Sequence, residues 1–216
     1  MDFATVKRGE VLRYMGCKGE VPPEVLNLAE ECLAMLGEVC EPRYVVREFP
    51  LKMPGDGVIE TDCFRTVSRN LEKNLKDCHK LLVFAATLGI GVDHLIRRYN
   101  RLDMSQTVAL QAGAAAVLEE YCDQVCRKLR EDYERQGFYL RPRFSPGYGD
   151  FPLDCQPQIL HGLEAGKRVG ITLTEGFLMM PTKSVTAVMG VGKTPVRCRV
   201  GGCEVCGKRD CAYRRG

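Results

Sequence analysis

One stretch of this sequence combines residue types that suit ligand binding. It runs from Arg141 to Pro152 and reads Arg-Pro-Arg-Phe-Ser-Pro-Gly-Tyr-Gly-Asp-Phe-Pro. Its prolines and glycines exclude a helix and a central strand and predict an irregular, extended bend. An arginine such as Arg143 holds a carboxylate through two parallel hydrogen bonds, and Tyr148 offers a flat apolar face. The bend therefore suits a small zwitterion that carries an aromatic ring, and the alternative is an ordinary surface loop.

Four cysteines near the C-terminus form a second chemical pattern. They are Cys198, Cys203, Cys206 and Cys211, with glycines between them that let the backbone fold closely around an ion. So short and polar a segment has no core of its own, so we expect a bound metal to order it. Four thiolates suit tetrahedral zinc or an iron–sulfur cluster, and the departure from paired C-x2-C spacing favours iron–sulfur. The alternative is a disordered tail with spare thiols.

The bend contains the motif Arg143-x-x-Pro146-Gly147-Tyr148, and several other segments carry motifs of their own. They span 84–89 with Val92-Asp93, 119–123, 170–177 and 180–185. Together they resemble the S-adenosylmethionine-binding activation domain of cobalamin-dependent methionine synthase, including its stand-alone members. The likeness extends over about residues 80 to 190 and is weak over the first 60.

The resemblance implies a set of ligand-binding residues and no catalytic side chain. Arg143 is expected to hold the carboxylate of S-adenosylmethionine. The backbone from Ser145 through Pro146 to Gly147 is expected to meet the amino group and the adenine. Tyr148 is expected to line the adenosine or the cobalamin side, and Glu175 and Ser184 to form part of the cavity wall. On physical grounds alone, Glu175 lies in an apolar stretch and is explained equally well by an ion pair with an arginine.

The family also implies a reaction and a partner. There, cobalamin that has oxidised to Co(II) is repaired by one electron and a methyl group from S-adenosylmethionine. This sequence lacks the cobalamin-ligating Asp-x-His-x-x-Gly motif. We therefore expect an accessory methyltransferase subunit that acts on the cobalamin of a separate methionine synthase. A reduced electron donor would supply the electron, and the four-cysteine tail would help to relay it. The alternatives are reactivation of another corrinoid methyltransferase and a zinc module whose basic tail binds nucleic acid.

Composition and charge narrow the class of protein. The chain has 216 residues, of which 45% are hydrophobic and 27% charged, which is enough for one core with a small appendage. The longest apolar run, 81–92, is too short to span a bilayer, and the N-terminus lacks a secretory signal, so we expect a cytoplasmic protein with no membrane contact. Residues 193–216 carry a charge of +5 within a net charge of +3. Cysteines 32, 78, 122 and 126 lie in apolar periodic segments, which predicts buried free thiols.

The elements that must position these residues follow from periodicity and turn signals. The sequence predicts helices over 22–36 (ending at Gly37), 62–79 (capped by Asp62), 91–100, 105–136 and 154–165, and strands over 44–52, 58–61, 81–87, 138–144, 171–173, 177–180 and 183–191. These elements show no regular βαβ alternation. We therefore predict an α+β fold, with a single domain over 1–195, a twisted, mainly antiparallel sheet with flanking helices, and a metal-binding tail over 196–216.

The glycines of Gly190-Val191-Gly192-Lys193-Thr194 resemble part of a phosphate-binding loop. The first glycine of such a loop would fall at position 187, which is an alanine, and Pro195 stands where its helix would begin. This segment is therefore predicted to be a strand. The three histidines are scattered without metal-ligand spacing and are expected on helix surfaces.

Overall fold

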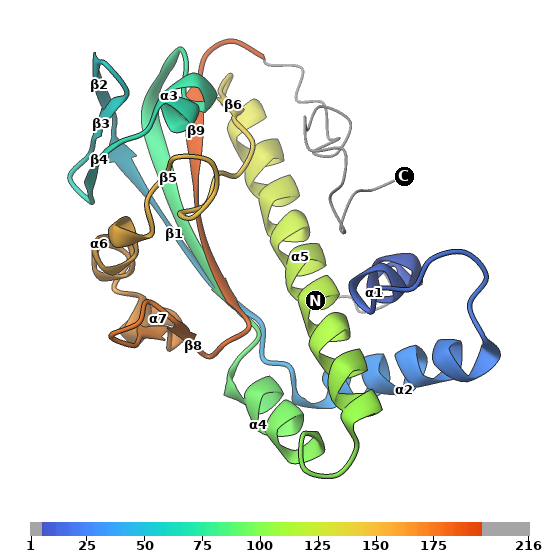
Figure 1. Ribbon diagram of the computed structural model, residues 1–216. Helices are drawn as coiled ribbons and strands as arrows, with labels where there is room; N and C mark the ends of the chain where they lie inside the picture. Colours follow the sequence, from blue (N-terminus) through green and yellow to red (C-terminus); the bar gives the residue numbers. More distant parts are fainter. Residues whose placement is uncertain (1–5, 196–216) are drawn as a thin grey trace.

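A computed structural model describes residues 6–195 of the chain. A four-stranded antiparallel sheet forms its centre, in the order β1 (Arg43–Pro50), β5 (Cys78–Thr87), β9 (Ser184–Gly192) and β6 (Tyr139–Leu140). The sheet is covered by structure on both sides (Figure 1). This arrangement confirms the predicted α+β class. The four cysteines of the tail lie outside the described residues.

The two faces of β5 explain why its sequence is apolar at every position from Leu81 to Ala86. Leu82, Phe84 and Ala86 pack into one hydrophobic core, whereas Leu81 and Val83 pack into the other. A strand buried on both faces loses the usual alternation of polar and apolar residues. The central strand β9 is buried on both faces for the same reason.

One face of the sheet is covered by long helices. The longest, α5 (Met104–Glu134), packs against α2 (Pro23–Val39), α1 (Arg8–Tyr14) and α4 (Ile90–Tyr99) (Figure 1). The side chain of Asp103 caps α5 by accepting hydrogen bonds from the N–H groups of Ser105 (2.8 Å) and Gln106 (3.1 Å). Within residues 6–195, no helix is both long enough and apolar enough to cross a membrane.

Short elements cover the opposite face. They are β2 (Lys52–Gly55), β3 (Val58–Glu60), β4 (Arg65–Val67), α3 (Arg69–Asn74), the 3-10 turn η2 (Leu153–Cys155), α6 (Gln156–Gly162), α7 (Ala165–Val169), β7 (Thr172–Leu173) and β8 (Met179–Met180). Strands β2, β3 and β4 form a small antiparallel sheet, and β7 and β8 form a hairpin. This face therefore contains many more turns than the helical face.

Several predicted elements were wrong in extent, including the strand expected over 138–144, of which only β6 (Tyr139–Leu140) is a strand. The helix expected over 62–79 is replaced by β4 and the short α3, because β4 pairs with β3 and Ser68 rather than Asp62 caps the helix. Helix α2 continues through Gly37 to Val39. The helix expected over 154–165 is divided between α6 and α7 at Glu164, whose backbone is left-handed with φ of 52°.

Candidate functional site

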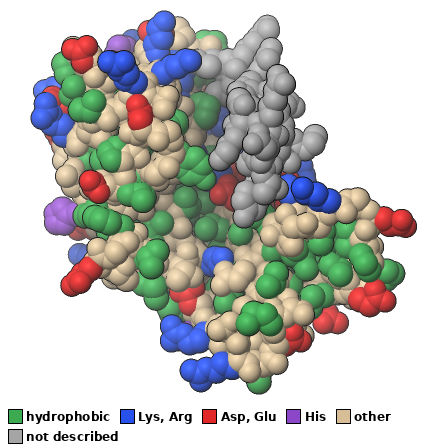
Figure 2. Space-filling model, viewed as in Figure 1, with side chains coloured by type: hydrophobic (Ala, Val, Ile, Leu, Met, Phe, Trp, Pro, Cys, Tyr) green, Lys and Arg blue, Asp and Glu red, His purple; other side chains and the backbone are tan. Residues whose placement is uncertain are grey.

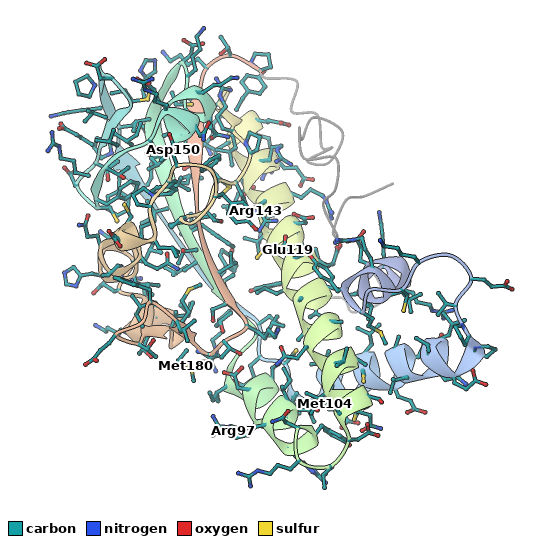
Figure 3. All side chains as sticks on the ribbon, in the orientation of Figure 1. Arg97, Met104, Glu119, Arg143, Asp150 and Met180 are labelled. Carbon is teal, nitrogen blue, oxygen red and sulfur yellow. The ribbon has the colours of Figure 1, made fainter. Side chains whose placement is uncertain are left out.

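Arg143 lies where the bend passes over helix α5 (Figure 3). The bend is tied to β9 next to it, because Phe144 and Val188 exchange two backbone hydrogen bonds of 2.9 Å. The Arg143 side chain is only 19% exposed. Its Nη2 atom lies 2.7 Å from Asp123 Oδ1 and 3.1 Å from Glu119 Oε2, so two carboxylates on one face of α5 hold the guanidinium.

The two carboxylates use only one of the three nitrogens of Arg143. Among the described residues, none hydrogen-bonds its Nη1 or Nε atom. A planar guanidinium with free donors can still grip a ligand carboxylate. Arg143 is thus held in place with part of its binding capacity unused.

The electrostatic setting keeps Arg143 charged. Burial works to lower its pKa, but the neighbouring groups, Cys122 and Cys126 first and then Glu119 and Asp123, raise it by more. Burial raises the pKa of Cys122 to about 12 and that of Cys126 to about 11, so both thiols are neutral near pH 7. The charge that stabilises Arg143 there comes from the two carboxylates.

Gly147 and Tyr148 form a tight corner directly after Arg143. The Tyr148 N–H donates to Ser145 O at 3.2 Å, and the Gly147 N–H donates to Phe151 O at 2.8 Å. Gly147 has φ of +90°, which favours glycine. Tyr148 is 69% exposed, so its ring is available at the surface for stacking.

Asp150 fastens this corner to helix α3 (Figure 3). Its carboxylate accepts hydrogen bonds from the Ser68 hydroxyl, the Arg69 N–H (2.8 Å) and the Asn70 N–H (3.1 Å). These bonds, led by that from Ser68, lower the pKa of Asp150. Sequence reasoning missed this residue, because its partners lie about 80 positions away.

Arg141 has a different role from Arg143. Its side chain is buried and donates to the backbone oxygens of Thr194 (3.0 Å) and Lys76 (3.1 Å). Gly192 and Gly190 leave the space that this side chain occupies, since a Cβ atom on Gly192 would lie 3.0 Å from Arg141 Nη2. Arg141 therefore stabilises the end of the sheet. The glycine pair lies within or at the end of β9, as the sequence predicted.

Glu175 and Ser184 do not contact Arg143 through hydrogen bonds or ion pairs. Glu175 is exposed in the turn between β7 and β8, not enclosed by apolar residues as the sequence suggested. Ser184 is buried, with its Oγ within 2.7 Å of Pro181 O and 2.8 Å of Thr87 Oγ1. Neither residue forms a hydrogen bond or ion pair with Arg143 in the described chain, and a role in ligand binding stays a prediction for both.

A small acidic pocket adjoins Arg143, between α1 and α5. It has a volume of about 80 Å³, and its lining includes Glu10, Tyr14, Glu119, Glu120 and Asp123. Glu119 and Asp123 stand four residues apart, which places them on one helix face. That spacing was the sequence signal that could have identified them as partners of a buried cation. Figure 2 shows a recess between the part of the molecule that carries α6 and α7 and the part that carries α1, α2 and α5, with hydrophobic side chains in it.

The described cysteines do not form a metal site. All eight cysteines of residues 6–195 are free, and Cys32, Cys78, Cys122 and Cys126 are buried, as predicted. That part of the chain contains no cluster of metal-ligating side chains. The predicted ligands Cys198, Cys203, Cys206 and Cys211 lie beyond it.

Comparison with known proteins agrees with the fold. The sequence model of a family described as "Vitamin B12 dependent methionine synthase, activation domain" matches residues 69–216. Among solved structures, the "Crystal Structure of the MetH Reactivation Domain bound to AdoHcy" is similar, with a TM-score of 0.67 and 20% identity over 91% of this chain and 78% of that chain. At that identity the structural likeness establishes the fold alone. The comparison with curated proteins found no match.

Proposed function

This chain belongs to the family of vitamin B12 dependent methionine synthase activation domains, and from that membership we propose that it binds S-adenosylmethionine at Arg143 and supports reductive methylation of cobalamin held by a partner protein. The observation that carries the proposal is the arrangement of Arg143. Its Nη2 donates hydrogen bonds to both Glu119 and Asp123, whereas the N–H groups of Nη1 and Nε form no hydrogen bond with any described residue and stay available to a ligand. Support for the ligand class also comes from the similar solved structure, a MetH reactivation domain bound to AdoHcy.

The charges around Arg143 suit both ends of an amino acid. Its unused donors complement the carboxylate of S-adenosylmethionine. Glu119 and Asp123 complement the ammonium and the positive sulfonium, and a carboxylate beside each cation offsets the desolvation that binding requires. The backbone at Ser145, Pro146 and Gly147 and the exposed ring of Tyr148 are proposed to meet the adenosine. Glu175 and Ser184 are proposed as more distant parts of the wall.

The proposed reaction transfers a methyl group without a catalytic side chain. The sulfonium–CH₃ bond of S-adenosylmethionine breaks, a Co–CH₃ bond forms on Co(I), and S-adenosylhomocysteine leaves. One electron from a reduced donor converts the partner's Co(II) to Co(I) beforehand. The residues of this chain hold the ligand and keep water away from the methyl group, so the contribution is one of orientation.

The tail is proposed to take part in electron supply. Cys198, Cys203, Cys206 and Cys211 could hold an iron–sulfur cluster, or zinc in the alternative. Anaerobic reconstitution with iron and sulfide, followed by visible absorption and EPR, would reveal a cluster that a Cys203→Ser/Cys206→Ser variant lacks. Tightly bound zinc without a cluster signal would remove the electron relay from the proposal. Nucleic-acid binding that falls steeply with salt, together with zinc, would support the module alternative.

Calorimetry with S-adenosylmethionine tests the binding proposal. Arg143→Ala is expected to weaken binding by about 2 kcal/mol or more, because a charged hydrogen-bonding partner is lost. Arg127→Ala, which removes an exposed arginine of helix α5, should bind as the wild type does. Equal affinities for all three proteins would contradict the proposal. Isolation of corrinoid proteins that bind the chain would then separate methionine synthase from another corrinoid methyltransferase as the partner.

A further inference from the structure

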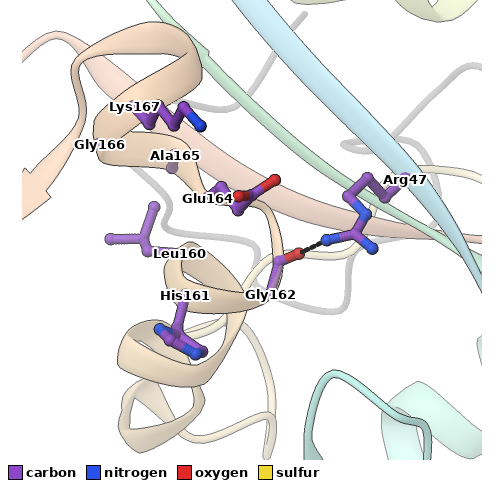
Figure 4. Close-up of a pocket in the computed structure, with 8 residues that line it drawn as sticks. All are labelled: Arg47, Leu160, His161, Gly162, Glu164, Ala165, Gly166 and Lys167. Atoms are coloured by element: carbon purple, nitrogen blue, oxygen red, sulfur yellow. Dashed lines mark hydrogen bonds between the residues drawn. The ribbon is translucent and has the colours of Figure 1, made fainter.

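We infer that a hollow between β1 and the turn from α6 to α7 binds a small phosphorylated metabolite that carries hydroxyl groups. The hollow has a volume of about 470 Å³, and its lining includes Arg47, Leu160, Glu164, Ala165 and Lys167 (Figure 4). Helices α6 and α7, which supply most of its lining, lie on the face of the sheet opposite α5 (Figure 1). The inference is thus independent of the proposed S-adenosylmethionine site at Arg143.

Arg47 is the fixed cation of this hollow. It projects from β1 on the same face as Val45 and Phe49, which belong to the core on this side of the sheet. Its Nη1 donates to Gly162 O at 2.5 Å, and its guanidinium lies 5.2 Å from the centre of the Phe49 ring. Within residues 6–195 its Nη2 and Nε make no hydrogen bond. The guanidinium is therefore oriented, with donors left for a ligand.

Lys167 supplies a second cation, and Glu164 supplies an acceptor. Glu164 Oε2 is engaged by Arg168, at 2.7 Å from Nη2 and 3.1 Å from Nε. Neither Arg47 nor Lys167 forms an ion pair in the described part of the chain. The left-handed backbone of Glu164 reverses the chain between α6 and α7, which brings Gly162 and Lys167 to the same hollow. The cluster thus has excess positive charge and one free carboxylate oxygen, Oε1.

These groups define the class of ligand. An oriented guanidinium and an ammonium suit a phosphate, and a carboxylate oxygen that would repel a bare phosphate accepts a hydrogen bond from a hydroxyl. Leu160 and Ala165 add an apolar part to the wall, and the volume lies within the range of small-molecule sites. Among the described residues that line the hollow, His161 offers one aromatic ring and there is no Phe, Tyr or Trp, so successive bases lack a stacking surface, which favours a metabolite over single-stranded nucleic acid.

Calorimetry of the full chain with ribose 5-phosphate tests the inference. We expect a Kd of about 1 mM or tighter, and a loss of about tenfold or more in Lys167→Gln. Lys128→Gln, an exposed lysine on α5, should leave the Kd unchanged. Arg143→Ala should also leave it unchanged, which separates failure of this inference from failure of the proposed function. Glu164→Gln should bind inorganic phosphate more tightly and lose the preference for the sugar phosphate.

Several results would overturn the inference. The first is that ribose 5-phosphate does not bind at about 10 mM. The second is that Lys167→Gln and Lys128→Gln lose equal affinity for it. The third is that sulfate and ribose 5-phosphate bind with equal affinity, which would indicate nonspecific charge attraction. A single-stranded oligonucleotide that binds more tightly and depends on Lys167 would assign the hollow to nucleic acid instead. Arg47→Gln is a second test that should lower affinity. Circular dichroism must accompany it, because Arg47 also bonds Gly162.

Discussion

Arg143 Nη2 lies 2.7 Å from Asp123 Oδ1, across 20 positions of sequence and between the bend and the longest helix. This ion pair orients the guanidinium and at the same time places a carboxylate beside the position that a zwitterionic ligand would occupy. A single contact thus defines both the positive and the negative half of the candidate site. Glu119, at 3.1 Å from the same nitrogen, repeats the arrangement.

The first prediction concerns these two carboxylates. Glu119→Gln and Asp123→Asn should each weaken S-adenosylmethionine binding about tenfold, because each removes a charged partner of the ligand's cations. Both side chains are substantially exposed, at 45% and 54%, so the free energy of unfolding should change by less than about 1 kcal/mol. Calorimetry and denaturant unfolding measure the two effects.

A ligand analogue separates recognition from positioning. If the carboxylates meet the ammonium, an analogue of S-adenosylmethionine without its amino group should be much less sensitive to both substitutions. Equal sensitivity would mean that Glu119 and Asp123 act only by orienting Arg143. Glu131→Gln, at an exposed position of α5, is the matched control.

The main elements could be predicted from the sequence where local signals and burial agree. Helix α5 has a strong apolar period, and β5 is an apolar run covered on both faces. The prediction of a helix over 62–79 was wrong because the apolar spacing of this segment is compatible with a helix. Only the tertiary structure shows that part of it, β4, pairs with β3. Val67 has helical spacing with Leu71 and Leu75 in the sequence, yet it is 62% exposed in β4.

Some residues of the candidate site could be singled out from the sequence, and others could not. The proline and glycine content of the bend marks it in the sequence, so Arg143 and Tyr148 could be singled out there. Composition alone could not distinguish Arg143 from Arg141; the family resemblance selected Arg143, and the fold shows that Arg141 bonds the backbone of Thr194 and Lys76. Glu119 and Asp123 belong to a helix surface where most charges are simply solvated, so their four-residue spacing becomes informative only together with their contact with Arg143.

The second prediction concerns Asp150, which joins the Pro-Gly corner to α3. Asp150→Ala should lower Tm, because the Ser68 hydroxyl and two N–H groups of the helix lose their acceptor. The pKa of Asp150 is lowered in the folded protein, so its contribution to stability is present above the unfolded pKa of about 3.9 and is lost as pH falls further. The difference in Tm between wild type and variant should therefore be constant above about pH 5 and shrink as the pH falls below about 4 toward the lowered pKa of the folded state.

Asp62 provides the control for this experiment. It is an exposed aspartate close to α3 in sequence, yet Ser68 and not Asp62 caps the helix. Asp62→Ala should show little change in Tm and no comparable pH dependence. A pH-independent loss in Asp150→Ala would indicate that the carboxylate charge is unimportant and that only the shape of the corner matters.

The third prediction concerns Gly190 in β9. A Cβ atom there would lie 2.6 Å from Cys78 Sγ and 2.8 Å from Leu75 Cδ2, so Gly190→Ala should destabilise the protein by about 1–3 kcal/mol through overpacking. Gly37→Ala is the opposite case, since no atom lies within 4 Å of its added Cβ in helix α2. It should stabilise by about 0.5–1 kcal/mol. Denaturant unfolding should resolve the opposite signs, and a Gly190→Ala protein as stable as wild type would be incompatible with this packing.

The fourth prediction is that ligand binding moves helix α1. The pocket between α1 and α5 has a volume of about 80 Å³, whereas sites for ligands of this size measure several hundred cubic ångströms. Helix α1 has seven residues, lies outside the family match over 69–216, and is followed by Gly16 and Gly19 with positive φ, where the chain can change direction.

Displacement of a short helix therefore opens space beside Glu119 and Asp123 at lower cost than movement of α5. Hydrogen exchange with and without S-adenosylmethionine should show altered protection in residues 8–22, and Arg143→Ala should abolish the change. Protection changes confined to the bend at 139–150 would show that the ligand binds without any rearrangement of α1.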